Sequence, residues 1–265
     1  MQHRSRRPDV LALSIFATLL LAACNSGSGG TGTPDADGDP STARLTGTAY
    51  TFNQCAAEPE QTQCRIVGAT INLVEFPDLS ATTDDAGAYA IDVPAGSTVT
   101  PYIVADGYRT IYLQTFTVDA DLENVNFQTP DLQTYAQLAL LLTTMGHIAP
   151  DLLGCVIVTT ASVPEVVGMP FEQFRTYNPH GVPGTTASGD PALPDAIYFN
   201  ENVVPDASVT STSEDGGILW TNVPPGVYTI SASNPDQAFA EFVADCQLGR
   251  VINANPPWGL HGLPR

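Results

Sequence analysis

The segment from Thr82 to Gly96 reads Thr-Thr-Asp-Asp-Ala-Gly-Ala-Tyr-Ala-Ile-Asp-Val-Pro-Ala-Gly, and it decides how the rest of the sequence is interpreted. Tyr89, Ile91 and Val93 alternate with small or polar residues, which is the pattern of a strand that buries one face. An acidic turn with a glycine precedes the strand, and a Val-Pro-Ala-Gly turn ends it. Proline cannot continue a ladder, and glycine accepts turn conformations closed to other residues.

The same pattern of turn, strand and turn occurs again 130 residues later without a gap. The six matching pairs are Thr82 and Thr212, Asp85 and Asp215, Gly87 and Gly217, Val93 and Val223, Pro94 and Pro224, and Gly96 and Gly226. An internal repeat of this kind predicts two domains of one type.

Short β-type runs surround both copies, at intervals of about ten residues with Gly, Pro and Asp between them. Strands at this spacing are typical of β-sandwiches. We expect strands in the first copy at 44–53, 65–75, 87–93, 98–105 and 109–118, and in the second from 155, then at 195–200, 207–212, 217–223, 226–232 and 238–245.

One segment between the two copies has the period of a helix. Thr129 can cap it, Pro130 suits its first turn, Asp131 opposes the helix dipole, and Gly146 ends it. Its apolar stripe is Leu132, Tyr135, Ala136, Ala139 and Leu142, widened by Leu138, Leu141 and Met145. A stripe this wide predicts a helix buried against a sandwich or between two.

The N-terminus has the pattern of an export signal. Three arginines, Arg4, Arg6 and Arg7, precede an apolar run, 10–23, that is too short to span a bilayer. The run closes with Leu-Ala-Ala before Cys24, which resembles the lipobox of bacterial lipoproteins. The resemblance implies cleavage of a signal peptide, 1–23, and acylation of Cys24, which anchors the chain because each buried CH₂ contributes about 0.8 kcal/mol. An ordinary signal peptide is the alternative.

Residues 24–43 are polar and rich in Gly, Ser, Thr and Asp, which predicts a disordered tether. Asn25 follows the cysteine where inner-membrane lipoproteins carry aspartate, so the resemblance implies the outer membrane, with the protein outside the cytoplasm. Loss of the leader leaves six Arg, no Lys and 27 acidic residues, a net charge of −21. This charge repels nucleic acid, so we expect no nucleic-acid partner.

Four cysteines remain after Cys24: Cys55, Cys64, Cys155 and Cys246. An even number in an exported chain predicts two disulfides, for which three pairings are possible. We favour Cys55 with Cys64, which flank a polar loop between two β-type runs, and Cys155 with Cys246. A zinc site is the alternative, but no Cys-x₂-Cys pair or nearby histidine supports it.

The first copy resembles a known family. Thr82 to Gly96, with Gly-Ala-Thr-Ile at 68–71 before it and Ala-Asp-Gly-Tyr at 105–108 after it, is similar to the carboxypeptidase regulatory-like domain. That family has a transthyretin-like (prealbumin-like) sandwich of seven strands and serves as an accessory module on peptidases, receptors and surface proteins. The resemblance covers about 44–120 well, whereas 155–250 matches less completely and lacks the final Gly-Tyr. The motif consists of turn residues, so it implies a fold and no active site.

The signatures of enzymes with related architecture are missing from the sequence. The His-x-x-Glu zinc motif of metallocarboxypeptidases, the His-x-His iron ligands of intradiol dioxygenases and the Gly-x-Ser-x-Gly elbow are all absent, and so is the lysine that isopeptide-forming adhesins need. We therefore expect no enzyme activity, no cofactor and no metal site.

The loop 161–194 of the second copy is long for a compact domain. It carries Phe174, Arg175, Tyr177 and His180, which could form a shallow binding site for a sugar, a peptide or a protein. The alternative is that Phe171 and Phe174 pin the loop to the sandwich while its polar residues are solvated.

Together these patterns predict an all-β protein: two transthyretin-like or Ig-like β-sandwich domains joined by one short α-helix, after a signal peptide and a flexible tether. The expected boundaries are 44–128, 129–153 for the helix, 154–254, and a tail at 255–265. The expected function is that of a membrane-anchored, non-enzymatic structural or interaction module of the adhesion type. The alternative is a carbohydrate- or peptide-binding accessory protein of a secreted enzyme. The expected partners are the lipid bilayer, through acylated Cys24, and an envelope protein or a glycan.

Overall fold

The computed structural model describes residues 41–52, 64–146, 150, 154–174 and 177–264. The predicted leader, Cys24 and nearly all of the tether lie outside these residues, and so does Cys55. Residues from Asp39 to Arg265 form one compact unit. The unit is mostly β-structure with one long helix, α1 (Leu132–Thr144), which confirms the predicted all-β fold class.

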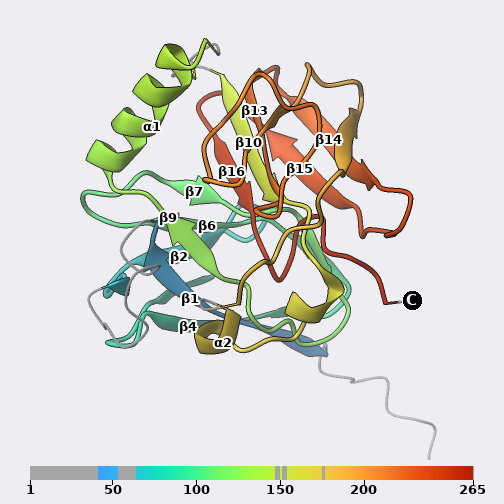
Figure 1. Ribbon diagram of the computed structural model, residues 1–265. Coiled ribbons are helices and arrows are strands. Elements are labelled where there is room, and N and C mark those ends of the chain that lie inside the picture. The colour runs from blue at the N-terminus through green and yellow to red at the C-terminus, as the bar shows by residue number, and fades with distance from the viewer. Residues whose placement is uncertain (1–40, 53–63, 147–149, 151–153, 175–176, 265) are drawn as a thin grey trace, which may run out of the picture. The chain divides into compact units, whose positions relative to one another are not determined.

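The first half of the unit packs two layers around an apolar core (Figure 1). In one layer β1 (Thr42–Thr51) lies between β4 (Ala88–Pro94), antiparallel to it, and β9 (Phe127–Thr129), parallel to it. The other layer contains β2 (Thr70–Leu73), β3 (Ser80–Thr82), β6 (Pro101–Val104) and β7 (Ile111–Tyr112). A two-stranded ribbon of β5 (Ser97–Val99) and β8 (Phe116–Val118) completes this half.

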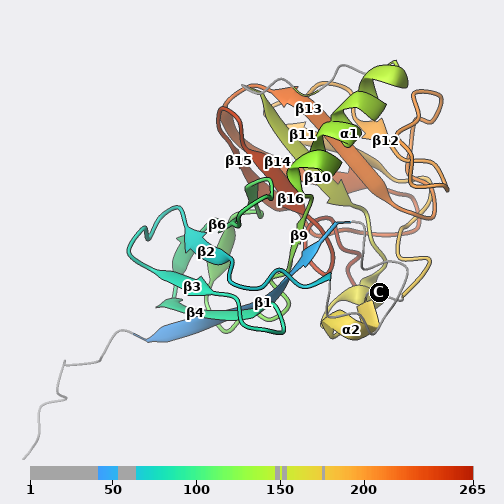
Figure 2. The same ribbon diagram turned by 90° about the vertical axis from the view of Figure 1, so that its left-hand side faces the viewer.

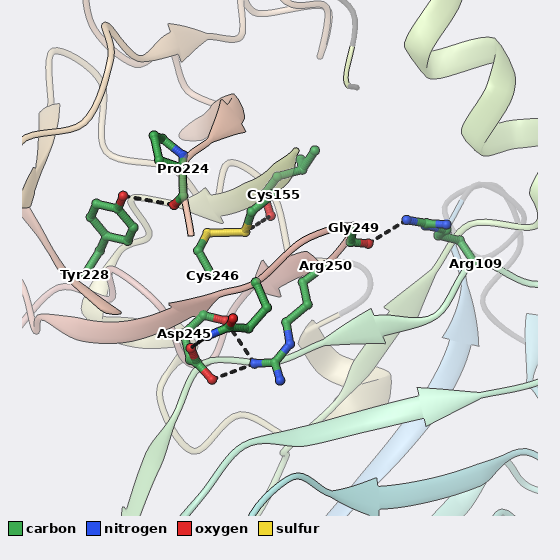
Figure 3. Close-up of a disulfide and its surroundings, with 10 residues drawn as sticks. Arg109, Cys155, Pro224, Tyr228, Asp245, Cys246, Gly249 and Arg250 are labelled. Atoms are coloured by element: carbon green, nitrogen blue, oxygen red, sulfur yellow. Dashed lines mark hydrogen bonds and ion pairs between the residues drawn. A yellow bond between two sulfur atoms is a disulfide. The ribbon is translucent and has the colours of Figure 1, made fainter. Parts of the chain in front are cut away.

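The second half repeats this plan around a second core. Here β10 (Cys155–Thr160) lies between β13 (Gly217–Val223), antiparallel, and β16 (Val251–Ala254), parallel, with β12 (Ile197–Tyr198) at the edge. The facing sheet contains β11 (Thr186–Asp190), β14 (Gly226–Ser233) and β15 (Phe242–Cys246). The predicted disulfide between Cys155 and Cys246 is confirmed, and it joins the two facing sheets through the core (Figure 3).

Only one cysteine of the other predicted disulfide lies within the described residues. Cys64 is fully buried beside Tyr50 and is disulfide-bonded. Its expected partner, Cys55, lies outside the described residues.

The two halves share one continuous sheet of eight strands, in the order β12-β13-β10-β16-β7-β6-β2-β3. The halves meet where β16 runs parallel to β7, with Ile252 opposite Tyr112. Arg250 reinforces this junction because its guanidinium lies 4.6 Å from the centre of the Tyr112 ring and binds the Asp245 carboxylate at 2.6 Å. Arg109 donates to the Gly249 carbonyl at 2.7 Å (Figure 3). The boundaries of the two predicted domains stay predictions.

The internal repeat is visible as a repeated hydrogen-bond network. The Thr83 hydroxyl donates to the Ile66 carbonyl at 2.7 Å and accepts from the Ala69 N–H at 2.9 Å. The Thr212 hydroxyl makes the same two bonds, to the Val182 carbonyl at 2.6 Å and from the Thr185 N–H at 3.0 Å. Each threonine thereby ties two neighbouring loop segments together inside its own half.

A glycine with positive φ follows each of these threonines, and it corrects the alignment of the repeat. Gly87 (φ +70°) and Gly216 (φ +76°) each leave no space for a Cβ, which would lie 2.7 Å from the carbonyl oxygen of Ala49 or Ala161. The matching pairs are therefore Thr83 with Thr212 and Gly87 with Gly216, whereas the repeat read at a constant offset paired Thr82 with Thr212 and Gly87 with Gly217.

A bulge in β13 accounts for the one-residue discrepancy. Val93 pairs with Ala43 of β1, and Val223 pairs with Cys155 of β10. Val93 and Val223 therefore still match at the predicted offset of 130 residues. Between Cys155 and Ile157 the register of β10 with β13 shifts, and Asn222 of β13 adopts a positive φ of 57°. One extra residue is accommodated there, as a β-bulge does.

The helix α1 differs from its prediction in its start and in its burial. Asp131 is the N-cap, because its side chain accepts the Thr134 N–H at 2.6 Å, whereas Thr129 ends β9. Gly146, with φ +82°, follows the C-terminus as expected. Only Leu142 is buried, so the expected burial of the whole stripe is wrong: the helix covers part of one sheet and leaves its other side exposed.

Several predicted strands also need correction. The loop 161–194 is not structureless: it contains η2 (Pro164–Val166), α2 (Phe171–Phe174) and β11. The run 98–105 is two strands, because the chain leaves β5 at the buried Thr100 and crosses to the other layer as β6. No strand forms at 207–212, and β16 was not expected as a strand.

We expect the double change Cys155→Ala and Cys246→Ala to lower the free energy of unfolding by about 4 kcal/mol, because the disulfide closes a long loop in the unfolded chain. The sequence separation of the two cysteines is 91 residues. Urea unfolding of the oxidised full chain measures the loss, with reduced wild-type protein as a comparison. Stability equal to that of the oxidised wild type would contradict a structural role for this bond.

Candidate functional site

A cleft of about 900 Å³ lies between α1 and the outer face of the sheet formed by β10, β13 and β16. Figure 2 shows α1 crossing in front of this sheet. Both halves contribute to the lining, which includes Tyr50, Phe52, Gln128, Tyr135, Leu138, Leu142, Val156, Val158, Phe174, Tyr177, His180, Phe199, Glu201, Glu214, Asp215, Leu219, Val251 and Asn253. The volume falls within the range of small-molecule sites.

The floor of the cleft consists of apolar side chains that point away from the second core. In β10, Val156 and Val158 face the cleft, whereas the neighbouring Ile157 packs into the core of the second half. Leu219 of β13 and Val251 of β16 also line the cleft, whereas their strand neighbours Ile218 and Ile252 are fully buried on the opposite face. Strands that are apolar on both faces need cover on both faces. The run Cys-Val-Ile-Val at 155–158 is the sequence signal that could have predicted this site.

The helix α1 supplies one wall. Leu138 and Leu142 line the cleft, and Leu142 joins the same apolar cluster as Val156, Leu219 and Val251. Tyr135 lies one turn nearer the N-terminus, where burial raises the pKa of its hydroxyl and the Arg109 charge opposes this rise. The Arg109 guanidinium lies 5.0 Å from the Tyr135 ring centre.

The loop 161–194 supplies the facing wall. Phe174, Tyr177 and His180, three of the four predicted binding residues, line the cleft, and the ring centres of Phe174 and His180 are 6.2 Å apart. The fourth, Arg175, lies outside the described residues. The backbone of His180 accepts the Val163 N–H at 2.9 Å, which fixes this part of the loop. The structure thus brings three predicted residues to one cleft, and their role in binding stays a prediction.

Carboxylates gather where β13 begins. Asp215 is the most buried of them, and desolvation raises the pKa of its carboxyl, while the neighbouring His180 and the Gly217 N–H oppose the rise. The Gly217 N–H donates to that carboxyl at 3.1 Å. Glu201 and Glu214 also line the cleft and are exposed.

An amide network lies in the floor near β9. Asn253 donates to the Gln128 carbonyl at 2.9 Å, and Asn255 donates to the Gln128 side-chain oxygen at 2.6 Å. Asn253 is only 6% exposed, and its Oδ1 has no hydrogen-bond partner. A buried amide oxygen without a partner is energetically costly, so this amide is a strained point in the floor of the cleft. Sequence patterns had given no indication of it.

The described residues contain no group of three or more His, Cys, Asp or Glu side chains placed to hold a metal ion. None of the helices in the described part of the chain is long and apolar enough to cross a bilayer. The walls of the cleft are mostly apolar, with a few polar side chains among them, and pockets of this composition are typical of small-molecule sites.

Comparison with known proteins assigns no family. No protein-family model matches the chain, and no curated protein matches its sequence. The shaft pilin SpaA of Lactobacillus rhamnosus GG is similar at 13% identity over 85% of this chain and 98% of that one, with a TM-score of 0.25. A minor pilin of Streptococcus agalactiae has 10% identity over 84% and 97%, with a TM-score of 0.25.

A type II cohesin–X-dockerin complex from Acetivibrio cellulolyticus has 18% identity over 37% of this chain and 73% of that one, with a TM-score of 0.27. Likenesses this weak carry no argument about function, so the site is interpreted from its own geometry. The resemblance to the carboxypeptidase regulatory-like domain stays a prediction.

We expect Asp215→Asn to raise the free energy of unfolding at neutral pH. Because folding raises the pKa of Asp215, the carboxyl favours the folded state when protonated, and that contribution is lost as the pH rises through the raised pKa. Asparagine keeps an acceptor for the Gly217 N–H and carries no charge. Urea unfolding from acid to neutral pH should show the gain shrinking toward acid, with Glu123→Gln as an exposed control. A variant that is less stable than wild type at neutral pH would contradict this account.

Proposed function

We propose that this protein is a lipid-anchored, non-enzymatic interaction module, exported from the cytoplasm, that binds a ligand with an apolar body in the cleft beside α1. The observation that carries the proposal is the cleft itself, whose floor, helix wall and loop wall are mostly apolar or aromatic. Val156, Leu219 and Val251 in the floor are already buried. The half-buried side chains of Leu138, Val158 and Tyr177 leave apolar surface in contact with water, and a ligand that removes this water would be favoured.

The cleft favours a ligand-binding role over a purely structural one. An adhesion or spacer module needs no concave apolar site of about 900 Å³. A carbohydrate would need a dense set of polar partners, whereas polar groups are few here and separated by apolar surface. An apolar ligand therefore fits better than the glycan considered from sequence.

The location is proposed from the N-terminal sequence. The basic leader, the short apolar run and the Leu-Ala-Ala-Cys motif ending at Cys24 support export and acylation, with the outer membrane as the destination. The buried disulfide between Cys155 and Cys246 is compatible with an oxidising compartment.

The binding role is tested on the full chain carrying Cys24→Ser, which keeps detergent micelles out of the assay. We expect the neutral probe N-phenylnaphthylamine to bind with increased fluorescence. Leu138→Gln should weaken this binding about tenfold, because it places a polar group on the wall of the cleft. Leu140→Gln is the matched control, since Leu140 is 64% exposed and lies outside the cleft.

Tyr177→Ala should weaken probe binding to a similar extent, because the ring lines the facing wall. Circular dichroism establishes that each variant is folded. The proposed binding function is wrong if the wild type does not bind the probe, or if Leu138→Gln and Leu140→Gln bind it equally well.

The anchoring part of the proposal is tested by mass spectrometry of the native protein. We expect the chain to begin at Cys24 and to carry two or three fatty chains on that residue. An intact leader or an unmodified residue 24 would refute the anchor and leave the cleft unaffected.

A further inference from the structure

We propose that α1 is a hinged lid over the cleft. Its first turn is fixed to the body of the protein, and the rest of the helix swings away from the sheet to admit the ligand and closes again over it. This inference rests on the proposed function, because it describes how the same cleft is opened and closed. Its basis is the uneven distribution of contacts along the helix.

The N-terminal end of α1 is fixed by hydrogen bonds to the loop before β7. The Arg109 N–H donates to the Pro130 carbonyl at 3.0 Å, and the Leu132 N–H donates to the Gly107 carbonyl at 3.0 Å. The Arg109 guanidinium adds to this attachment, because it packs on the Tyr135 ring at 5.0 Å from the ring centre. The first turn of the helix therefore moves with the body and can serve as the hinge.

Beyond Tyr135 the helix has no polar attachment to the rest of the described protein. No hydrogen bond or ion pair joins 136–146 to another described element, and this stretch contains no charged side chain. The hydroxyls of Thr143 and Thr144 donate to carbonyls of the helix itself, at 3.1 and 2.8 Å. Residues 145–154 connect α1 to β10, and a chain of this length can span up to about 33 Å. Displacement of the helix therefore breaks no hydrogen bond among the described residues.

One buried side chain holds this part of α1 against the sheet. Leu142 is 5% exposed and belongs to the same apolar cluster as Val156 and Leu219 of the cleft floor. Leu138 and Leu141 also line the cleft but are only half-buried. A segment with few buried apolar contacts opens at a lower free energy than the core of the protein. The helix can therefore leave the sheet while both sandwiches stay folded.

A ligand in the cleft favours the closed position of the lid. A ligand shifts a conformational equilibrium only when it binds one state better than the other. In the closed position the ligand contacts the floor, for example at Val158, and also the helix wall at Leu138. In the open position it contacts the floor alone. Binding and closure are therefore coupled, because each additional contact to the helix is made only in the closed state.

The position of the lid is measured by pulsed electron–electron double resonance between two spin labels. The full chain carrying Cys24→Ser receives one label at Leu140→Cys, on the exposed side of α1, and one at Thr229→Cys, an exposed position of β14. A second protein, labelled at Thr117→Cys of β8 and at Thr229→Cys, reports on the body alone. With the native Leu142, we expect each pair to show one main distance, because the open state is a minor population.

Leu142→Ala should release the lid, because it removes the side chain that holds the helix. We expect the ratio of open to closed molecules to rise about thirtyfold, which adds a second distance for the label on α1 and none for the reference pair. Alanine is a strong helix former, so the helix itself stays formed. Saturating N-phenylnaphthylamine should restore the closed distance. Met145→Ala is the matched control, since Met145 is 42% exposed and does not line the cleft, and it should leave both distances unchanged.

The lid is refuted if Leu142→Ala keeps the single distance, since α1 is then a fixed wall. It is also refuted if the reference pair changes as much as the lid pair, which would show a general loosening, or if the probe does not return the opened variant to the closed distance. The proposed binding function stands in each case, because binding of the probe to the protein with the native Leu142 is measured separately by fluorescence. If that protein does not bind the probe, the binding function fails, and the lid fails with it.

Discussion

The parallel pairing of β16 with β7 is the constraint on which the rest of the structure depends. It joins the sheet of one half to the sheet of the other, edge to edge. The Arg250 side chain stabilises this joint from both sides, since it binds Asp245 in its own half and packs on Tyr112 in the other. The tail adds to the joint, because Trp258 donates to the Asn124 carbonyl at 3.1 Å and packs against Phe116. The cleft exists because this joint holds β1 and β9 beside the outer face of β10 and β16.

The repeat explains how one chain came to have a cleft between two similar halves. Each half uses a buried threonine and a glycine with positive φ to close the same turn onto its central strand. In the first half the central strand β1 begins in a three-stranded layer, whereas in the second half β10 belongs to the shared sheet. The outer face of β10 therefore lies opposite α1 and the loop 161–194, and it forms the floor of the cleft.

Much of the fold could be predicted from local patterns. The alternation around Tyr89 and the turn residues of both copies identified β4 and β13, and the cysteine count led to the disulfide between β10 and β15. The features that local patterns missed depend on contacts between residues that are distant in the sequence. Thr129 is a good cap by residue type, yet it completes β9 because β1 offers it a ladder, and Asp131 takes the cap instead. A one-residue bulge at Asn222 shifted half of the repeat without leaving a gap in the alignment.

The candidate site was predictable in part. The aromatic and histidine residues of the loop 161–194 indicated one wall, because such residues rarely gather in a long loop without a contact to make. The floor was missed, since apolar runs on both faces of β10 were interpreted simply as a strand. Asn253 could not have been found from sequence, because its amide is held by the carbonyl of Gln128, which is distant in the chain.

Differential scanning calorimetry tests the central claim, that a shared sheet makes the two halves one structure. For the oxidised chain the account predicts a single transition in which the calorimetric enthalpy equals the van't Hoff enthalpy, because neither half can unfold without breaking the joint. Two resolved transitions, or a calorimetric enthalpy about twice the van't Hoff value, would show that the halves unfold independently and would contradict the account.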